Sequence, residues 1–187
     1  MTADTMRYSK VAIGLHWLIA LMIIGLIIFG ILMTNPDTPN RFALYQLHKS
    51  FGICVLILSV LRLIWRLGHK PPALPQGMKA WEVAAAKLTH VAFYVIMIGM
   101  PLLGWAMISS SETVIPTKIF NTLPWPDIPG LPRDKAISDI FKNLHHWIGK
   151  GTIVLILLHV GAALKHHIVN KDNVLARMLP FLRKSRL

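Results

Sequence analysis

Four long stretches of mostly apolar side chains, separated by shorter polar segments, dominate the chain. They cover about residues 11–33, 42–65, 83–108 and 140–166. The first is the clearest, because its 23 residues include no Asp, Glu, Lys or Arg, and about 20 apolar residues cross the hydrocarbon core of a bilayer as a helix. It is also longer than the apolar region of a secretory signal peptide. The pattern predicts an all-α membrane protein with four transmembrane helices, in one domain over residues 1–187.

The composition supports a membrane location. Of the 187 residues, 54% are hydrophobic, and the mean hydropathy is +0.54. Both values exceed those typical of soluble domains. We therefore expect the lipid bilayer to be the main partner of this chain. Its only cysteine, Cys54, lies inside the second apolar stretch, so no disulfide can form within the chain.

The cationic residues predict an orientation. The formal net charge is +12, and most Lys and Arg residues lie before the first stretch, between the second and third, and in a basic tail over about residues 170–187. Cytoplasmic segments of membrane proteins are enriched in Lys and Arg, so we expect both termini to be cytoplasmic. Attraction to anionic lipid then explains the charge without nucleic acid. The cations assigned to this side are Arg7, Lys10, Arg62, Arg66, Lys70, Lys79, Lys87, Lys165, Lys171, Arg177, Arg183, Lys184 and Arg186.

The connection between the third and fourth stretches is external in this orientation. It is the longest connection, and it contains several prolines, which disfavour helix. We therefore expect an extended or turn-rich segment there.

Histidines inside the apolar stretches suggest a cofactor. His145 and His159 are fourteen positions apart on the fourth stretch, which returns to nearly the same helix face after roughly 21 Å. His16 and His48 lie on the first and second stretches. With alternating helix directions, His16 lies at the depth of His159, and His48 lies at the depth of His145. This geometry predicts two stacked haems, each held by two histidines, and the lack of a C-x-x-C-H run excludes covalent c-type attachment.

Small residues follow each of these four histidines. The residue four positions on lies on the same helix face, one turn away. A small side chain there leaves room for a flat cofactor beside the ligand. The residues in question are Ala20, Gly52, Gly149 and Ala163, whereas none of the other histidines in the helical stretches that we compared is followed by a small residue at this spacing.

Two alternative ligands stay open. His146 could replace its neighbour His145, since a shift of one residue turns a side chain by about 100° around the helix. His90 is the second choice at the cytoplasmic site. Cations within or at the ends of the stretches could either extend to the lipid headgroups or pair with haem propionates. These cations are Lys49, Arg62, Lys142 and Lys150.

The chain resembles a known family in ordered segments spread over about residues 6–180. It is similar to the bacterial cytochrome b561 family, which is related to the di-haem cytochrome b subunits of nickel-iron hydrogenase and formate dehydrogenase. The resemblance implies a multi-pass protein of the bacterial inner membrane with two b haems, and its ligand pattern maps onto His16, His48, His145 and His159. The segments that carry it are GLHWLIALMIIGL, LHKSFGICVLILSVLRLIWRL, THVAFYVIMIGMPLLGW, HHWIGKGTIVLILLHVGAALKHH and NKDNVLARMLP.

The resemblance also implies electron exchange with ubiquinone. One branch of the family oxidises superoxide at the external face and passes the electron to quinone, which makes a superoxide:ubiquinone oxidoreductase the leading expectation. Basic residues near the external haem would attract a small anion, although Asp127, Asp134 and Asp139 dilute their field. The basic residues are Lys49, Arg133, Lys135, Lys142 and Lys150.

A quinone contact is expected beyond the cytoplasmic haem. His166 lies seven residues after His159, nearly on the same face, and an imidazole can both hydrogen-bond a quinone carbonyl and deliver a proton. His167, Lys165, Arg62 and Arg66 are weaker candidates for this role.

Two other functions are compared with this one. A di-haem subunit could relay electrons between quinone and a separate dehydrogenase, hydrogenase or periplasmic partner. A zinc transporter is disfavoured, because the predicted spans contain no Asp and the only nearby Glu is Glu82 at an interface.

Overall fold

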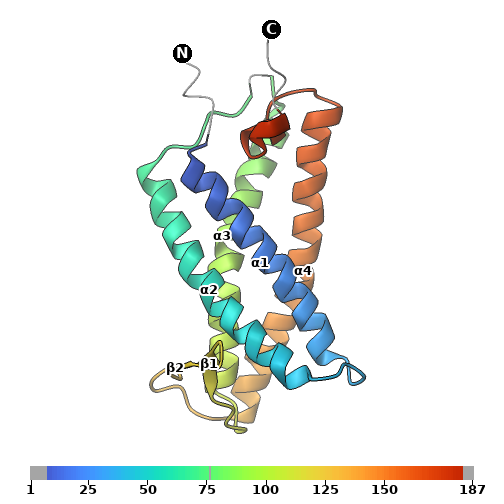
Figure 1. The fold of residues 1–187 in the computed structure, drawn as a ribbon. Coiled ribbons are helices and arrows are strands. Elements are labelled where there is room, and N and C mark those ends of the chain that lie inside the picture. Colours follow the sequence, from blue (N-terminus) through green and yellow to red (C-terminus); the bar gives the residue numbers. More distant parts are fainter. Residues whose placement is uncertain (1–7, 76, 183–187) are drawn as a thin grey trace.

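The protein is a bundle of four long helices (Figure 1). The structure, a computed structural model, describes residues 8–75 and 77–182. Each helix is long and apolar enough to cross a membrane, which confirms the predicted all-α class. Each also contains the corresponding predicted stretch and extends beyond it at both ends. The helices are α1 (Lys10–Thr34), α2 (Arg41–Gly68), α3 (Ala80–Ser109) and α4 (Lys135–Ile168).

Local sequence signals set the helix ends. The side chains of Ser9 and Asp134 accept hydrogen bonds from backbone amides in the first turns of α1 and α4. Glu82 accepts the Lys79 amide at 3.0 Å at the start of α3. Such caps satisfy amides that have no partner within the helix. The helix α2 ends shortly before Pro71, since proline cannot continue it.

A short hairpin fills part of the connection between α3 and α4. Its strands, β1 (Thr117–Ile119) and β2 (Leu123–Trp125), pair antiparallel. The hairpin is tied to α2, because the buried Ser50 hydroxyl accepts the Phe120 amide at 2.9 Å and Lys49 Nζ donates to the Pro116 carbonyl at 3.2 Å. The extended conformation expected from the prolines is therefore present here.

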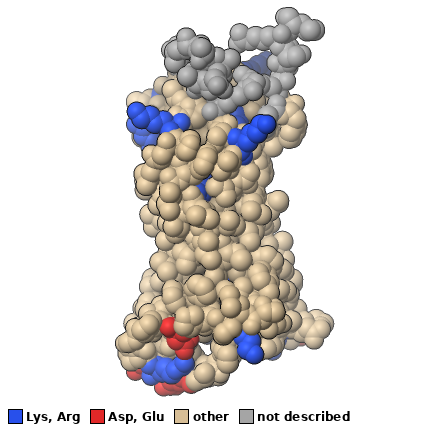
Figure 2. Space-filling model, turned by 60° about the vertical axis from the view of Figure 1, so that its left-hand side comes forward, with Lys and Arg blue, Asp and Glu red and all other residues tan. Residues whose placement is uncertain are grey.

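Helix packing leaves an apolar exterior. Close contacts join α1 to α2, α2 to α3 and α3 to α4, and a small buried cluster of Ile19, Val55 and Met97 lies between three of the helices. Large apolar side chains elsewhere face outward, and Leu88 is 71% exposed. Figure 2 shows one face on which charged residues gather toward the two ends. This distribution is that of a membrane-spanning bundle, whose middle contacts lipid.

The two ends of the bundle differ. The "hairpin end" carries β1 and β2, and the "terminal end" is where the described chain begins and finishes (Figure 1). At the terminal end, the chain after α4 forms two short 3-10 helices, η2 (Leu175–Arg177) and η3 (Pro180–Leu182). Four cations used to predict the orientation, Arg7, Arg183, Lys184 and Arg186, lie outside the described residues.

Candidate functional site

At the hairpin end, the structure brings His48 of α2 opposite His145 of α4. Their ring centroids are 6.1 Å apart, and the ring planes are inclined by 67°. A metal ion that binds two imidazole nitrogens lies ~2 Å from each, which places the ring centroids about 6 Å apart once the ring radii are added. The spacing therefore suits one metal centre between the two rings. The neighbouring His146 is exposed and lies against Trp147 instead.

The helices on either side hold these two rings in place. His145 Nδ1 lies 3.2 Å from the Met100 carbonyl, so its N–H donates to α3 and Nε2 keeps a lone pair for a metal. A Cβ on Gly104 would come within 3.3 Å of the His145 ring, and one on Gly30 within 3.6 Å of the His48 ring. Glycine at these two positions lets α3 and α1 approach the imidazoles closely.

A pocket beside this pair contains buried polar atoms without partners. Trp125 Nε1 and His48 Nδ1 are buried, and neither has a hydrogen-bond partner among the described residues. Lys49 and Thr117 also line the pocket. An unpaired buried donor is costly, and a haem propionate would supply an acceptor for the indole N–H. The residues present therefore fit a haem at the hairpin end.

The terminal end brings three imidazoles together. The ring centroids of His16 of α1 and His159 of α4 are 6.3 Å apart, with planes inclined by 65°. His90 of α3 lies 6.1 Å from His159 as well. Both His16, the expected partner of His159, and His90, the second choice, therefore lie at a distance that would allow one metal ion to bind between their ring and that of His159.

Two guanidinium groups lie next to this cluster. Arg62 Nη2 is 3.2 Å from His16 Nδ1, and both Arg62 and Arg66 lie within 6 Å of the centre of the Tyr94 ring. Neither arginine forms an ion pair within residues 8–75 and 77–182. Because an arginine can only donate, His16 Nδ1 accepts here and the proton of the neutral ring is on Nε2. Metal binding through Nε2 therefore requires the proton to move to Nδ1 and Arg62 to turn away.

The cations near the hairpin end are partly neutralised. Arg133 pairs with Asp127, and Lys135 pairs with Asp139. Lys150 lies 4.6 Å from the centre of the Trp147 ring. Lys49, which lines the pocket of the histidine pair, has no carboxylate partner in the described part of the chain. The electrostatic attraction of anions to the hairpin end therefore depends on fewer cations than the sequence suggested, because Arg133 and Lys135 are paired with carboxylates.

His166 lies at the terminal end and is only 9% exposed. Its Nδ1 is 2.6 Å from the carboxylate of Asp172. The adjacent His167 is exposed. The sequence provided the histidine but gave no reason to select Asp172, because the link depends on how the chain folds back after α4.

Comparisons with known proteins bear on this arrangement. The family model for prokaryotic cytochrome b561 matches residues 7–181. The chain belongs to the prokaryotic cytochrome b561 family. Two similar proteins of Escherichia coli K12 are "Cytochrome b561 homolog 1", 33% identical over 93% of this chain and 97% of its own, and "Cytochrome b561 homolog 2", 31% identical over 92% and 91%. A third, "Probable superoxide oxidase CybB" of Yersinia pestis, is 29% identical over 93% of this chain and 96% of its own.

Membership of the cytochrome b561 family settles the general chemistry. The family binds haem b and transfers electrons, and the four helices agree with a multi-pass bacterial membrane protein. The expected resemblance is therefore confirmed. The assignment of particular histidines as ligands stays a prediction, for which the two pairs of facing rings are the structural support.

Proposed function

We propose that this protein carries electrons across the bacterial inner membrane through two b haems, from external superoxide to ubiquinone. The observation that carries the proposal is the arrangement of histidines on α4. His145 and His159 each face a histidine of another helix at about 6 Å, and fourteen residues along a helix span roughly 21 Å. Two bound haems would thus lie at two depths, one near each end.

The residues of the chain determine how the haems would be held. His48 and His145 would hold the haem iron at the hairpin end, and His16 and His159 would hold it at the terminal end. With two imidazoles on each iron, the haems would supply one-electron transfer without small molecules binding the metal. Trp125 would donate to a propionate at the hairpin end, and Arg62 would pair with propionates at the terminal end.

The overall reaction balances. Two superoxide anions each give up one electron to become two molecules of oxygen, and ubiquinone takes up these two electrons and two protons to become ubiquinol. Lys49 at the hairpin-end pocket attracts the anion. The quinone binds near His166 at the terminal end. Both chain termini are then cytoplasmic, as the Lys and Arg distribution predicts.

The similarity to a probable superoxide oxidase supports superoxide as the electron donor. A second candidate for the donor is a protein. A di-haem subunit of a separate enzyme would receive electrons from a protein at the external face. The hairpin exposes Phe120 and Leu123, which are 46% and 59% accessible, and such residues are suitable contacts for a protein.

The test uses purified full-length protein in detergent. Pyridine-haemochrome quantitation is expected to give two b haems per chain, and a reduced-minus-oxidised spectrum is expected to show rapid reduction by superoxide and reoxidation by a ubiquinone analogue. Two haems indifferent to superoxide would favour the protein-partner alternative. No haem, or one haem per chain, would contradict the proposed site.

A further inference from the structure

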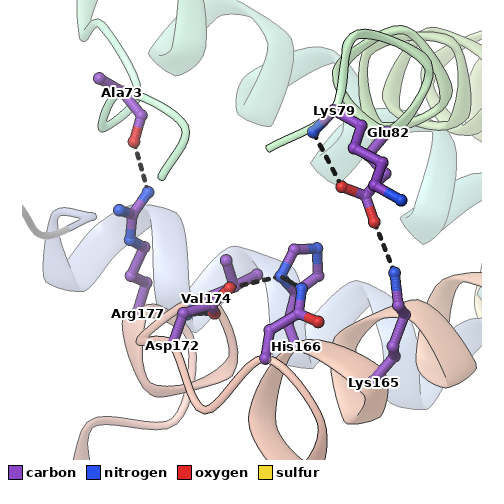
Figure 3. A network of polar contacts seen from close by, with 9 residues as sticks. Ala73, Lys79, Glu82, Lys165, His166, Asp172, Val174 and Arg177 are labelled. Atoms are coloured by element: carbon purple, nitrogen blue, oxygen red, sulfur yellow. Dashed lines mark hydrogen bonds and ion pairs between the residues drawn. The ribbon is translucent and has the colours of Figure 1, made fainter. Parts of the chain in front are cut away.

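A network of polar contacts lies at the terminal end of the bundle (Figure 3). After α4 the chain turns back, and Arg177 donates to the carbonyl of Ala73 in the connection between α2 and α3. The indole N–H of Trp17 in α1 donates to the Met178 carbonyl at 2.8 Å. The returning segment is thus attached to two other parts of the molecule.

His166 lies beneath this segment as a buried imidazole with a carboxylate partner. Asp172 Oδ2 is 2.6 Å from His166 Nδ1, while Asp172 Oδ1 accepts the Val174 amide at 2.9 Å. The Asp172 amide also donates to the His166 carbonyl at 3.1 Å. The carboxylate is therefore fixed in position, and it commits Nδ1 as a donor. A proton that the ring exchanges must then bind at Nε2.

An open pocket of about 400 Å³ lies beside this pair. Asp172 and Asn170 both line the pocket. Lys165 and Glu82 form a separate ion pair at another part of the same pocket. His166 itself does not line the pocket, whereas its partner Asp172 does.

We propose that Asp172 and His166 deliver the protons consumed in quinone reduction, taken from the aqueous side of the terminal end. This rests on the proposed function, in which a quinone receives the electrons. For each ubiquinol formed, the His166 Nε2–H bond breaks twice and two O–H bonds form on the reduced quinone. Each time, the ring regains its proton at Nε2 from the aqueous side of the terminal end. Asp172 acts as a positioning residue that holds the ring and balances its charge when both nitrogens carry protons.

Other charged groups in this region come from three different elements. Lys165 and His167 belong to α4 itself, Lys79 and Glu82 come from the start of α3, and Arg177 comes from η2. Glu82 is engaged by Lys165 and by the Lys79 amide. Its carboxylate makes no hydrogen bond to His166, which makes it a matched control for Asp172.

The experiment compares two oxidants on the reduced, haem-loaded full-length protein. A short-chain ubiquinone analogue needs protons, whereas ferricyanide accepts one electron and no proton. Asp172→Asn and His166→Gln are each expected to slow reoxidation by the quinone on the order of 100-fold, with haem content and reoxidation by ferricyanide unchanged. Asp172→Glu, which keeps a carboxylate, is expected to recover most of the rate. Glu82→Gln is expected to behave as the wild type, and the wild-type quinone reaction is expected to slow in D₂O while the ferricyanide reaction does not.

Several outcomes would overturn the proposal. Quinone rates within about twofold of wild type in both Asp172→Asn and His166→Gln would exclude the proton role, since a general acid contributes far more. Equal slowing by both oxidants, or equal slowing in Glu82→Gln, would indicate a general structural effect. These results would leave the proposed function intact. If the quinone does not reoxidise even the wild-type haems, the assigned acceptor is wrong, and the proton role falls with it.

Discussion

The two histidine pairs lie on the same helix but have different surroundings. At the hairpin end, the backbone of α3 and two glycines surround the rings of His48 and His145. At the terminal end, His16 and His159 share their space with a third imidazole, His90, and with the guanidinium of Arg62. Close packing around the rings therefore characterises the hairpin-end site. A nearby positive charge and a third histidine characterise the terminal-end site.

This difference has a consequence for the direction of electron flow. Positive charge near a haem favours the reduced form, because reduction lowers the net charge of the iron, and protein charge is one determinant of haem potential. Arg62 and Arg66 lie next to the terminal-end cluster without ion-pair partners in the described chain. We therefore expect the terminal-end haem to have the higher potential, which makes transfer from an external donor favourable.

Removal of the α4 histidines gives the largest effect and tests whether the two sites are independent. His145→Ala and His159→Ala are each expected to abolish binding of one haem and to retain the other, because no other α4 histidine faces His48 or His16. Pyridine-haemochrome quantitation should fall from two haems per chain to one. A variant that retains both haems would show that the altered histidine is not a ligand.

The choice of ligand at the terminal end is tested by a matched pair of variants. His16→Ala is expected to remove the terminal-end haem, whereas His90→Ala is expected to retain it with bis-histidine spectra. Both rings are about 6 Å from His159, so the contact distances alone do not separate them. Electron paramagnetic resonance of the oxidised haems shows whether the terminal-end haem is still bound by two histidines in each variant. The reverse pattern would assign His90 as the ligand and His16 as its neighbour.

Shape complementarity at the hairpin end is tested at the two glycines. Gly104→Ala places a methyl group 3.3 Å from the His145 ring, and Gly30→Ala places one 3.6 Å from the His48 ring. Overpacking of a close contact costs ~1 to 3 kcal/mol, so Gly104→Ala is expected to weaken haem binding at this end by about tenfold. Gly30→Ala, at ordinary contact distance, should have little effect. Haem titration of the apoprotein measures both, and equal affinities would mean that the ring of His145 moves freely.

The sequence predicted the helices well because their signal is local. A stretch of 23 uncharged residues has few alternatives to a transmembrane helix. The spacing of His145 and His159 is likewise a property of one helix, and the structure adds that each faces the expected histidine. Contacts between helices were harder to predict. The small residues that follow each ligand predicted room for a cofactor, as at Gly52 and Gly149, but they did not reveal that Gly30 and Gly104 of neighbouring helices lie against the rings.

Other contacts depend on parts of the chain that are far apart in sequence. The Met100 carbonyl and His145 are 45 residues apart, and Arg62 and His16 are 46 apart. No periodicity within one helix reveals such pairs. The cations near the hairpin end show the same limitation, since their charge could be counted but their ion pairs with Asp127 and Asp139 could not be predicted.

The smallest expected effect tests the electrostatic side of the comparison. Arg62→Met removes a positive charge beside the terminal-end histidines and is expected to lower the midpoint potential of that haem by about 60 mV, which is ~1.4 kcal/mol for a one-electron couple. The hairpin-end haem should keep its potential, because its surroundings do not include Arg62. A redox titration that resolves both haems measures the shift, and Lys87→Met, which removes an exposed cation from α3, controls for net charge. If both variants shift the potential equally, the arginine acts only through the total charge of the protein. If neither shifts it, Arg62 does not approach the haem.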